Sequence, residues 1–169
     1  MKIILAPDSF KGSLSADGVC AALELGLRRV LPNATDADII KRPMADGGEG
    51  TLDAIVAALS SSGARRKQAL VRNAAGQSAE AGYALIRSGI YEAAVIEVAQ
   101  IVGIEDAHNM AVPVGDRSTY GVGELIRLLL AEGIRHFFVG LGGTSTNDGG
   151  AGLLAALGVK FTGTFRREV

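Results

Sequence analysis

Carboxylate, hydroxyl, ammonium and glycine residues gather in three short segments of this chain. The first segment, residues 6–13, contains Asp8, Ser9 and Lys11. Lys11 can neutralise a phosphate or a substrate carboxylate, while Asp8 can orient a hydroxyl group or bind a metal ion. A polar loop with an incidental surface lysine is the alternative interpretation of this segment.

The second segment combines acidic residues with an adaptable backbone. Residues 44–51 contain Asp46 and Glu49, with glycines at Gly47, Gly48 and Gly50. Glycine lets the backbone approach a ligand closely, and the carboxylates suit Mg²⁺ binding or proton abstraction. The alternative is a tight turn in which Thr51 only caps a helix.

The third segment, residues 140–152, contains six glycines, three hydroxyl side chains, one amide and one carboxylate. Backbone N–H groups and hydroxyls in such a loop can surround phosphate oxygens. It is neither a Walker A sequence nor a Rossmann fingerprint, and a flexible surface loop is the alternative. The residues expected to contact phosphate are Gly142, Gly143, Thr144, Ser145, Thr146, Asn147, Gly149 and Gly150.

One tripeptide occurs in both acidic loops. Asp46-Gly47-Gly48 returns as Asp148-Gly149-Gly150 about a hundred residues later. The repeat would allow Asp46 and Asp148 to converge on one Mg²⁺–phosphate site, although a three-residue match is weak evidence alone.

Strands and helices that alternate along the chain are expected to position these loops. The hydrophobic pattern predicts strands over 2–6, 37–42, 136–141 and 159–162, and helices over 16–30, 51–59, 119–132 and 151–157, with Ser15 as an N-cap. Each loop thus follows a strand and precedes a helix. Ligands gather at that end of an open parallel sheet, where helix N-termini favour anions.

The middle of the chain departs from this rhythm. Residues 66–72, 80–87 and 91–98 read as strands, the first two as an antiparallel hairpin, and residues 99–118 as a loop. The predicted fold is α/β, a mainly parallel sheet with helices on both faces and two α/β subdomains. The predicted regions are 1–70, the first segment of a discontinuous domain, and 71–169.

The composition narrows the possible partners and location. The 169 residues include 17 basic and 18 acidic side chains, so neither nucleic acid nor an anionic membrane is expected as a partner. The single cysteine, Cys20, excludes an internal disulfide and a cysteine-based zinc site. No apolar run approaches the ~20 residues of a membrane span, and we expect a cytoplasmic protein.

Four segments in order resemble the signature segments of the type-1 bacterial glycerate kinases. They are residues 6–15, 43–51, 119–126 and 140–152. The match concerns the N-terminal portion of that family, whose members continue well beyond the length of this chain. The resemblance implies two α/β domains with a cleft between them, one of them flavodoxin-like.

The resemblance also implies a reaction, in which ATP phosphorylates the 2-hydroxyl of glycerate with Mg²⁺. Loop 142–150 would bind ATP phosphates, Asp46 and Asp148 would bind Mg²⁺ or act as a base, and Lys11 would offset negative charge. Substrate contacts would come from Asp8, Ser9, Gly47, Gly48 and Glu49. Two alternatives stay open: a non-catalytic nucleotide- or phosphometabolite-binding module, and an inactive truncated fragment held together as a homo-oligomer.

Overall fold

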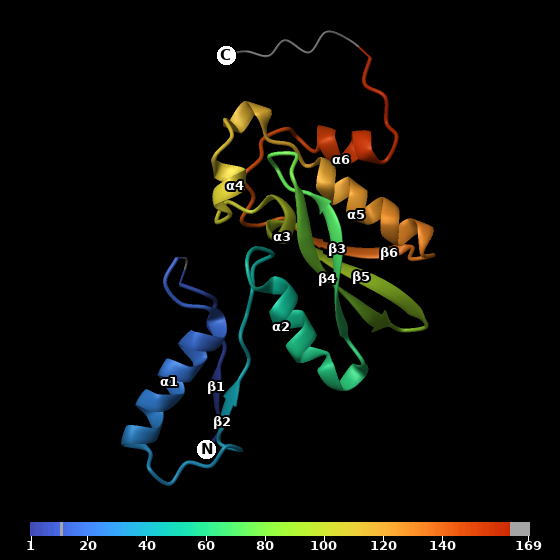
Figure 1. Cartoon of the computed structure of the whole chain (residues 1–169). Coiled ribbons are helices and arrows are strands. Elements are labelled where there is room, and N and C mark those ends of the chain that lie inside the picture. Colours follow the sequence, from blue (N-terminus) through green and yellow to red (C-terminus); the bar gives the residue numbers. More distant parts are fainter. Residues whose placement is uncertain (11, 163–169) are drawn as a thin grey trace.

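The first part of the chain forms a small βαβ unit. A computed structural model describes residues 1–10 and 12–162 (Figure 1). Strands β1 (Ile3–Leu5) and β2 (Ile39–Lys41) pair in parallel, and helix α1 (Ala16–Val30) connects them. The Ser15 side chain accepts a hydrogen bond from the Gly18 N–H at 3.2 Å, which confirms the predicted cap. Leu5, Cys20 and Ile39 form the core of this unit.

A four-stranded sheet forms the larger part of the molecule. Its order is β3 (Arg65–Arg72), β4 (Ser78–Ser88), β5 (Tyr91–Glu97) and β6 (His136–Gly140). The β3–β4 hairpin is confirmed as antiparallel, β4 and β5 are also antiparallel, and only β5 and β6 are parallel. The prediction of a mainly parallel sheet was therefore only partly right, because short turns join β3, β4 and β5 and force neighbouring strands to reverse direction.

Helices cover both faces of this sheet, as predicted (Figure 1). Helix α2 (Thr51–Ala58) packs Leu52 against alternate residues of β4 and β5, including Ile86 and Val95. The opposite face packs against α3 (Ala99–Val102) and α5 (Tyr120–Ala131). Because side chains alternate across a strand, β4 and β5 have apolar residues on both faces and lie between two helical layers.

The remaining segments differ from the sequence prediction in two places. The predicted loop 99–118 contains α3, the short helix α4 (Ala107–Met110) and the 3₁₀ turn η2 (Val114–Asp116). A second 3₁₀ turn, η1 (Ser60–Ser62), follows α2, and α6 (Ala151–Ala156) follows the third loop. The predicted strand 159–162 was wrong, since these residues pair with no other strand within the described part of the chain.

Candidate functional site

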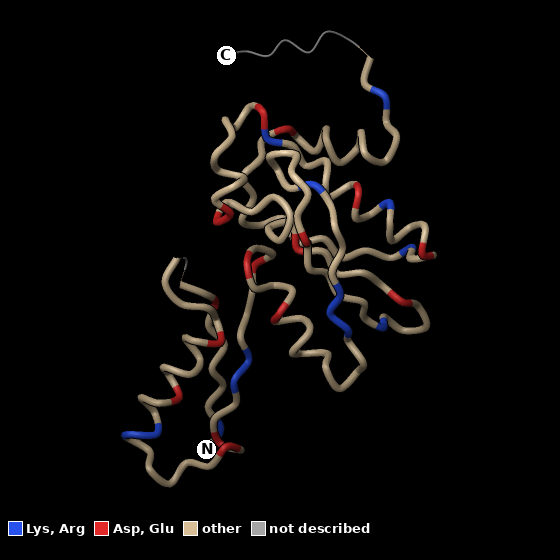
Figure 2. Tube along the Cα trace, viewed as in Figure 1, with Lys and Arg blue, Asp and Glu red and all other residues tan. Residues whose placement is uncertain are grey.

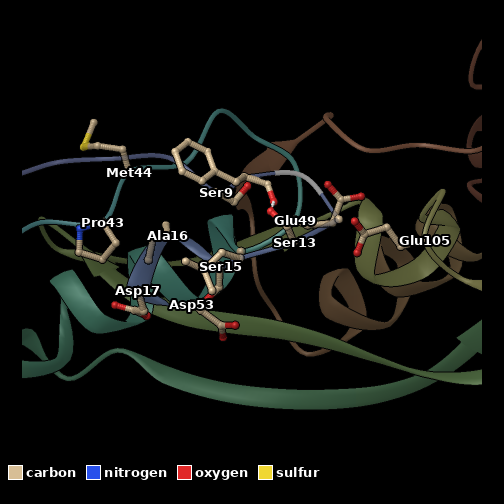
Figure 3. A pocket seen from close by; sticks show the side chains of 15 residues that line it. Ser9, Ser13, Ser15, Ala16, Asp17, Pro43, Met44, Glu49, Asp53 and Glu105 are labelled. Carbon is tan, nitrogen blue, oxygen red and sulfur yellow. Dashed lines mark hydrogen bonds between the residues drawn. The ribbon is translucent and has the colours of Figure 1, made fainter. Parts of the chain in front are cut away.

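A cavity separates the βαβ unit from α2. It has a volume of about 740 Å³ and is lined by residues 9–10, 12–17, 43–44, 49–50 and 53–54 together with Glu105 (Figure 3). The first and second loops thus lie on the walls of one cavity, although about thirty residues separate them.

The cavity wall is acidic. Asp17, Glu49, Asp53 and Glu105 line it, whereas none of the described lining residues is lysine, arginine or histidine. Acidic positions recur on α1, in the loop before α2 and along α2 (Figure 2). Asp53, in the first turn of α2, forms an ion pair with Arg66. The four carboxylates would attract a cation into this cavity.

Hydrogen bonds between nearby residues fix the conformation of the second loop. The Asp46 carboxylate accepts from the Gly48 N–H at 3.1 Å through Oδ1, and the Thr51 hydroxyl accepts from the Gly47 N–H at 3.1 Å. Gly50 begins α2 in the left-handed region at φ 87°, a conformation that glycine adopts without strain. The exposed Asp46 thus keeps its second carboxylate oxygen without an internal partner among the described residues.

The second and third loops meet through their backbones. The Gly142 N–H donates to the Gly47 carbonyl at 2.9 Å. A Cβ atom on Gly142 would lie 2.5 Å from the Gly48 nitrogen, and one on Gly140 would lie 2.7 Å from the Gly47 oxygen. Only glycine permits this approach, so Gly47 and Gly48 meet the start of the third loop, ahead of its Asp148-Gly149-Gly150 tripeptide.

The Glu49 side chain lies at the contact between the second and third loops. Its carboxylate lies against Gly143, where any added Cβ would collide with it. Glu49 Oε1 is buried and has no hydrogen-bond partner within the described residues. A buried oxygen of this kind is unfavourable unless a proton, a water molecule or a cation satisfies it.

Asp148 lies in a different environment from Asp46. Its carboxylate accepts from the Thr119 N–H at 2.8 Å, the Thr119 hydroxyl at 2.9 Å, and the Gly150 and Gly152 N–H groups at 3.1 Å each. Burial alone would raise the pKa of Asp148, but these hydrogen bonds outweigh it and the pKa lies below its ordinary value. Asp148 therefore joins the first turns of α5 and α6.

The rest of the third loop divides into buried and free polar groups. Ser145 is buried, and both its N–H and its hydroxyl donate to the Val102 carbonyl, at 2.8 and 2.9 Å. By contrast, the side chains of Thr144, Thr146 and Asn147 make no hydrogen bond to the described part of the chain. These three side chains, with the exposed Gly149, are the groups of this loop that remain available to a ligand.

The first loop is only partly described. Ser9 lines the cavity, while the exposed Asp8 accepts from the Ser9 N–H at 2.7 Å. Lys11, the predicted charge-neutralising residue, lies outside the described residues. In sequence it stands between Phe10 and Gly12, which both line the cavity.

Two carboxylates near the loops were missed by the sequence analysis. Glu105 lines the cavity from the segment between α3 and α4, where no pattern marks it. Glu97 is fully buried at the end of β5. A charged residue that ends an apolar strand was the available signal for Glu97.

These features define an α/β protein without a Walker A or Rossmann motif, in which the first and second loops line one acidic cavity and the third loop packs against the second. The family model described as the Glycerate kinase family matches residues 3–169. The chain belongs to this family.

Individual relatives agree with the family match. The chain is 45% identical to a glycerate kinase of Halalkalibacterium halodurans over 163 residues, which cover 94% of this chain and 40% of the relative. It is 41% identical to a glycerate 2-kinase of Escherichia coli, covering all of this chain and 42% of that protein. The chain thus spans about 40% of the length of these relatives and corresponds to their N-terminal part.

A solved structure resembles the fold as well. The crystal structure of a Salmonella typhimurium protein, described provisionally as glycerate kinase 2, gives a TM-score of 0.66 at 42% identity. The similarity covers 94% of this chain and 40% of that one. No helix within residues 1–10 and 12–162 is long and apolar enough to cross a bilayer.

Proposed function

We propose that this chain carries the substrate-binding loops of a glycerate kinase, a phosphotransferase that transfers the γ-phosphoryl group of ATP to the 2-hydroxyl of glycerate. The observation that carries the proposal is the contact between Gly47 and Gly142, which joins the loop on the cavity wall to the hydroxyl-rich loop. Phosphoryl transfer depends mainly on positioning the two substrates and on neutralising charge, and two adjoining loops of this composition suit both tasks.

In this proposal the third loop receives the phosphates of ATP. Within residues 1–10 and 12–162, the side chains of Thr144, Thr146 and Asn147 have no hydrogen-bond partner, and they can donate hydrogen bonds to phosphate oxygens. Gly142 and Gly143 bring the backbone of the same loop up to the second loop. Ser145 instead supports the loop through Val102.

The cation site is expected at the second loop. No three carboxylate, histidine or cysteine side chains of the described residues are placed to hold a metal ion by themselves. Mg²⁺ commonly binds through one or two carboxylates together with waters and substrate phosphates. Glu49, with its unpartnered buried Oε1, and Asp46, with one free oxygen, fit that requirement. Bound there, Mg²⁺ would neutralise phosphate charge.

The proposal gives the two aspartates different roles. Asp46 is the candidate base for the 2-hydroxyl proton or the candidate cation ligand, because it is exposed and, as far as the structure describes the chain, one of its two oxygens has no hydrogen bond. Asp148 has both oxygens hydrogen-bonded, so we assign it a positioning role. Lys11 and Ser9, from the first loop, are the proposed contacts of the glycerate carboxylate.

A coupled assay that measures ADP release from this chain with glycerate and Mg-ATP tests the proposal. We expect glycerate-dependent release that Asp46→Asn sharply reduces. The control is Asp36→Asn, which removes an exposed carboxylate whose partner is Arg28 on α1, away from the cavity. Near wild-type turnover in Asp46→Asn would contradict the role given to Asp46.

A nucleotide-binding module is the second candidate function. Within the described residues the side chains of Thr144, Thr146 and Asn147 have no hydrogen-bond partner, so they could bind phosphate without any catalytic step. Calorimetric binding of Mg-ATP with no ADP release would select a nucleotide-binding module. Neither binding nor release would contradict both functions.

A further inference from the structure

A buried carboxylate lies directly beneath the second loop. Glu97 is completely inaccessible to solvent and is the last residue of β5. Its Oε2 accepts from the Leu52 N–H at 2.8 Å, and its Oε1 accepts from the Gln100 side-chain amide at 3.1 Å. No cation is paired with it among the described residues.

The first turn of α2 depends on this carboxylate. The N-cap residue is Gly50, which has no side chain to accept from the free N–H groups of the helix. Glu97 takes that place from a position 45 residues away. The Leu52 side chain is itself fully buried against Ala84 and Val95, so both its N–H and its side chain are held by the sheet.

Glu97 also stands where the second and third loops meet. In the β5–β6 ladder it lies opposite Gly140, whose carbonyl accepts from the Val98 N–H at 3.0 Å. Gly140 in turn approaches the Gly47 carbonyl too closely to allow a side chain. One buried group thus connects the end of β5, the start of the third loop and the helix that follows the second loop.

The buried carboxylate of Glu97 fixes the position of a helix, which is more than an apolar packing residue could do. Burying a carboxylate is unfavourable unless hydrogen bonds and a favourable field compensate it. Here two donors and the positive end of α2 supply that compensation. The arrangement fixes the first turn of α2 at a defined place, which an apolar residue at position 97 would not do.

We propose that Glu97 is a positioning residue for the reaction. It anchors α2 so that Glu49 faces the cavity and the loop that carries Asp46 keeps its place before the helix. The inference rests on the proposed function for its link to catalysis. It also means that the Leu52 N–H is occupied by the protein itself, so phosphate must be bound by other groups.

The test compares three variants of the whole chain by amide hydrogen exchange and by calorimetry with Mg-ATP and glycerate. Glu97→Leu removes the acceptor, and Glu97→Gln keeps a weaker one. Glu124→Leu is the matched control: Glu124 accepts from the Arg72 N–H at 2.9 Å and also joins a helix to a strand, but it lies on α5 away from the cavity.

In the ligand-free chain we expect amides 47–52 to exchange about 10-fold faster in Glu97→Leu and about 3-fold faster in Glu97→Gln, with no change there in Glu124→Leu. Ligand affinity should fall in the same order. If Glu97→Leu does not fold, Glu97→Gln decides the question. Unchanged exchange at 47–52, or an increase spread evenly over the chain, would overturn the positioning role.

The two proposals fail in different ways. A wild-type chain that binds neither glycerate nor Mg-ATP, while Glu97→Leu and Glu97→Gln loosen residues 47–52, would overturn the proposed function and leave the anchoring of α2 standing. Ligand binding that is equally tight in the wild type, Glu97→Leu and Glu124→Leu would overturn the link between Glu97 and the reaction.

Discussion

The two Asp-Gly-Gly loops begin with the same local bond and then differ. Asp46 accepts from the N–H two residues ahead, at Gly48, and Asp148 does the same with Gly150, each at 3.1 Å. Asp46 has no further internal partner among the described residues and is exposed. Asp148 accepts in addition from Thr119, 29 residues away, and from Gly152.

The difference shows that an identical motif can serve two purposes. A carboxylate that accepts four hydrogen bonds stabilises the chain around it and has little capacity left for a ligand. One that is exposed and accepts a single hydrogen bond contributes little to folding and keeps capacity for another partner. The repeat in the sequence therefore marks one loop with an exposed carboxylate and one loop whose carboxylate joins two helices.

The largest effect is expected where the two loops touch. Gly142→Ala should destabilise the chain by about 3 kcal/mol, because the new methyl group would meet the backbone of Gly48, which cannot rotate away. Gly26→Ala in α1 is the control. A Cβ atom added to Gly26 would have no atom of another described element within 4 Å, so this substitution should stabilise the chain by about 0.5–1 kcal/mol. Urea unfolding measures both, and equal free energies of unfolding would contradict the tight contact between the loops.

The two aspartates should separate in stability. Asp148→Asn should lower the free energy of unfolding by about 2 kcal/mol, since an amide oxygen replaces the carboxylate that accepts from Thr119, Gly150 and Gly152. Asp46→Asn keeps an acceptor for Gly48 and should change it by less than about 0.5 kcal/mol. If the two variants were equally stable in denaturant titrations, the structural distinction between the loops would be wrong.

The same distinction predicts a pH dependence. The pKa of Asp148 is lower in the folded chain than its ordinary value, because hydrogen bonds from Thr119, Gly152 and Gly150 outweigh the effect of burial. Its contribution is thus fully present above the unfolded pKa of about 3.9 and is lost as pH falls through the folded value. The stability gap between the wild type and Asp148→Asn should be constant above about pH 5 and narrow below about pH 4. A gap that widens on acidification has the wrong sign for this account.

One threonine in each loop region should show a smaller effect than Gly142→Ala or Asp148→Asn. Thr119 donates to Asp148 and accepts from the Leu153 N–H, so Thr119→Val should cost about 1.5 kcal/mol. Among the described residues the Thr51 hydroxyl accepts one hydrogen bond, from the Gly47 N–H, and Thr51→Val should cost about 0.5 kcal/mol. Thermal unfolding measures the loss of stability in each variant. A larger loss in Thr51→Val than in Thr119→Val would contradict the difference in hydrogen bonding between the two threonines.

Much of the fold follows from local patterns in the sequence. Ser15 and the apolar spacing after it predicted α1, and the turn-rich residues 73–77 predicted the β3–β4 hairpin. The mainly parallel sheet was expected because strands and helices alternate at both ends of the chain. The reversal of β4 and β5 depends on their short connection, which that rhythm does not reveal.

The site was predictable only in part. Each loop follows a strand, from which one ligand-binding edge of a single sheet was expected. The Gly47–Gly142 bond brings the second and third loops together, but β2 and β6, which precede them, belong to different sheets. The partners of Asp148 were not predictable, because Thr119 reaches it through packing of α5 against α6. Glu97 was missed for the same reason: its function as a cap depends on an approach across 45 residues.

Calorimetric titration of Mg-ATP and glycerate into Asp46→Asn and Asp148→Asn, at a temperature where both variants are folded, tests the central claim most directly. The account predicts that Asp46→Asn weakens binding at least about 10-fold, or about 1.4 kcal/mol, and that folded Asp148→Asn binds close to the wild type. Wild-type affinity in Asp46→Asn, with binding lost in Asp148→Asn instead, would contradict it.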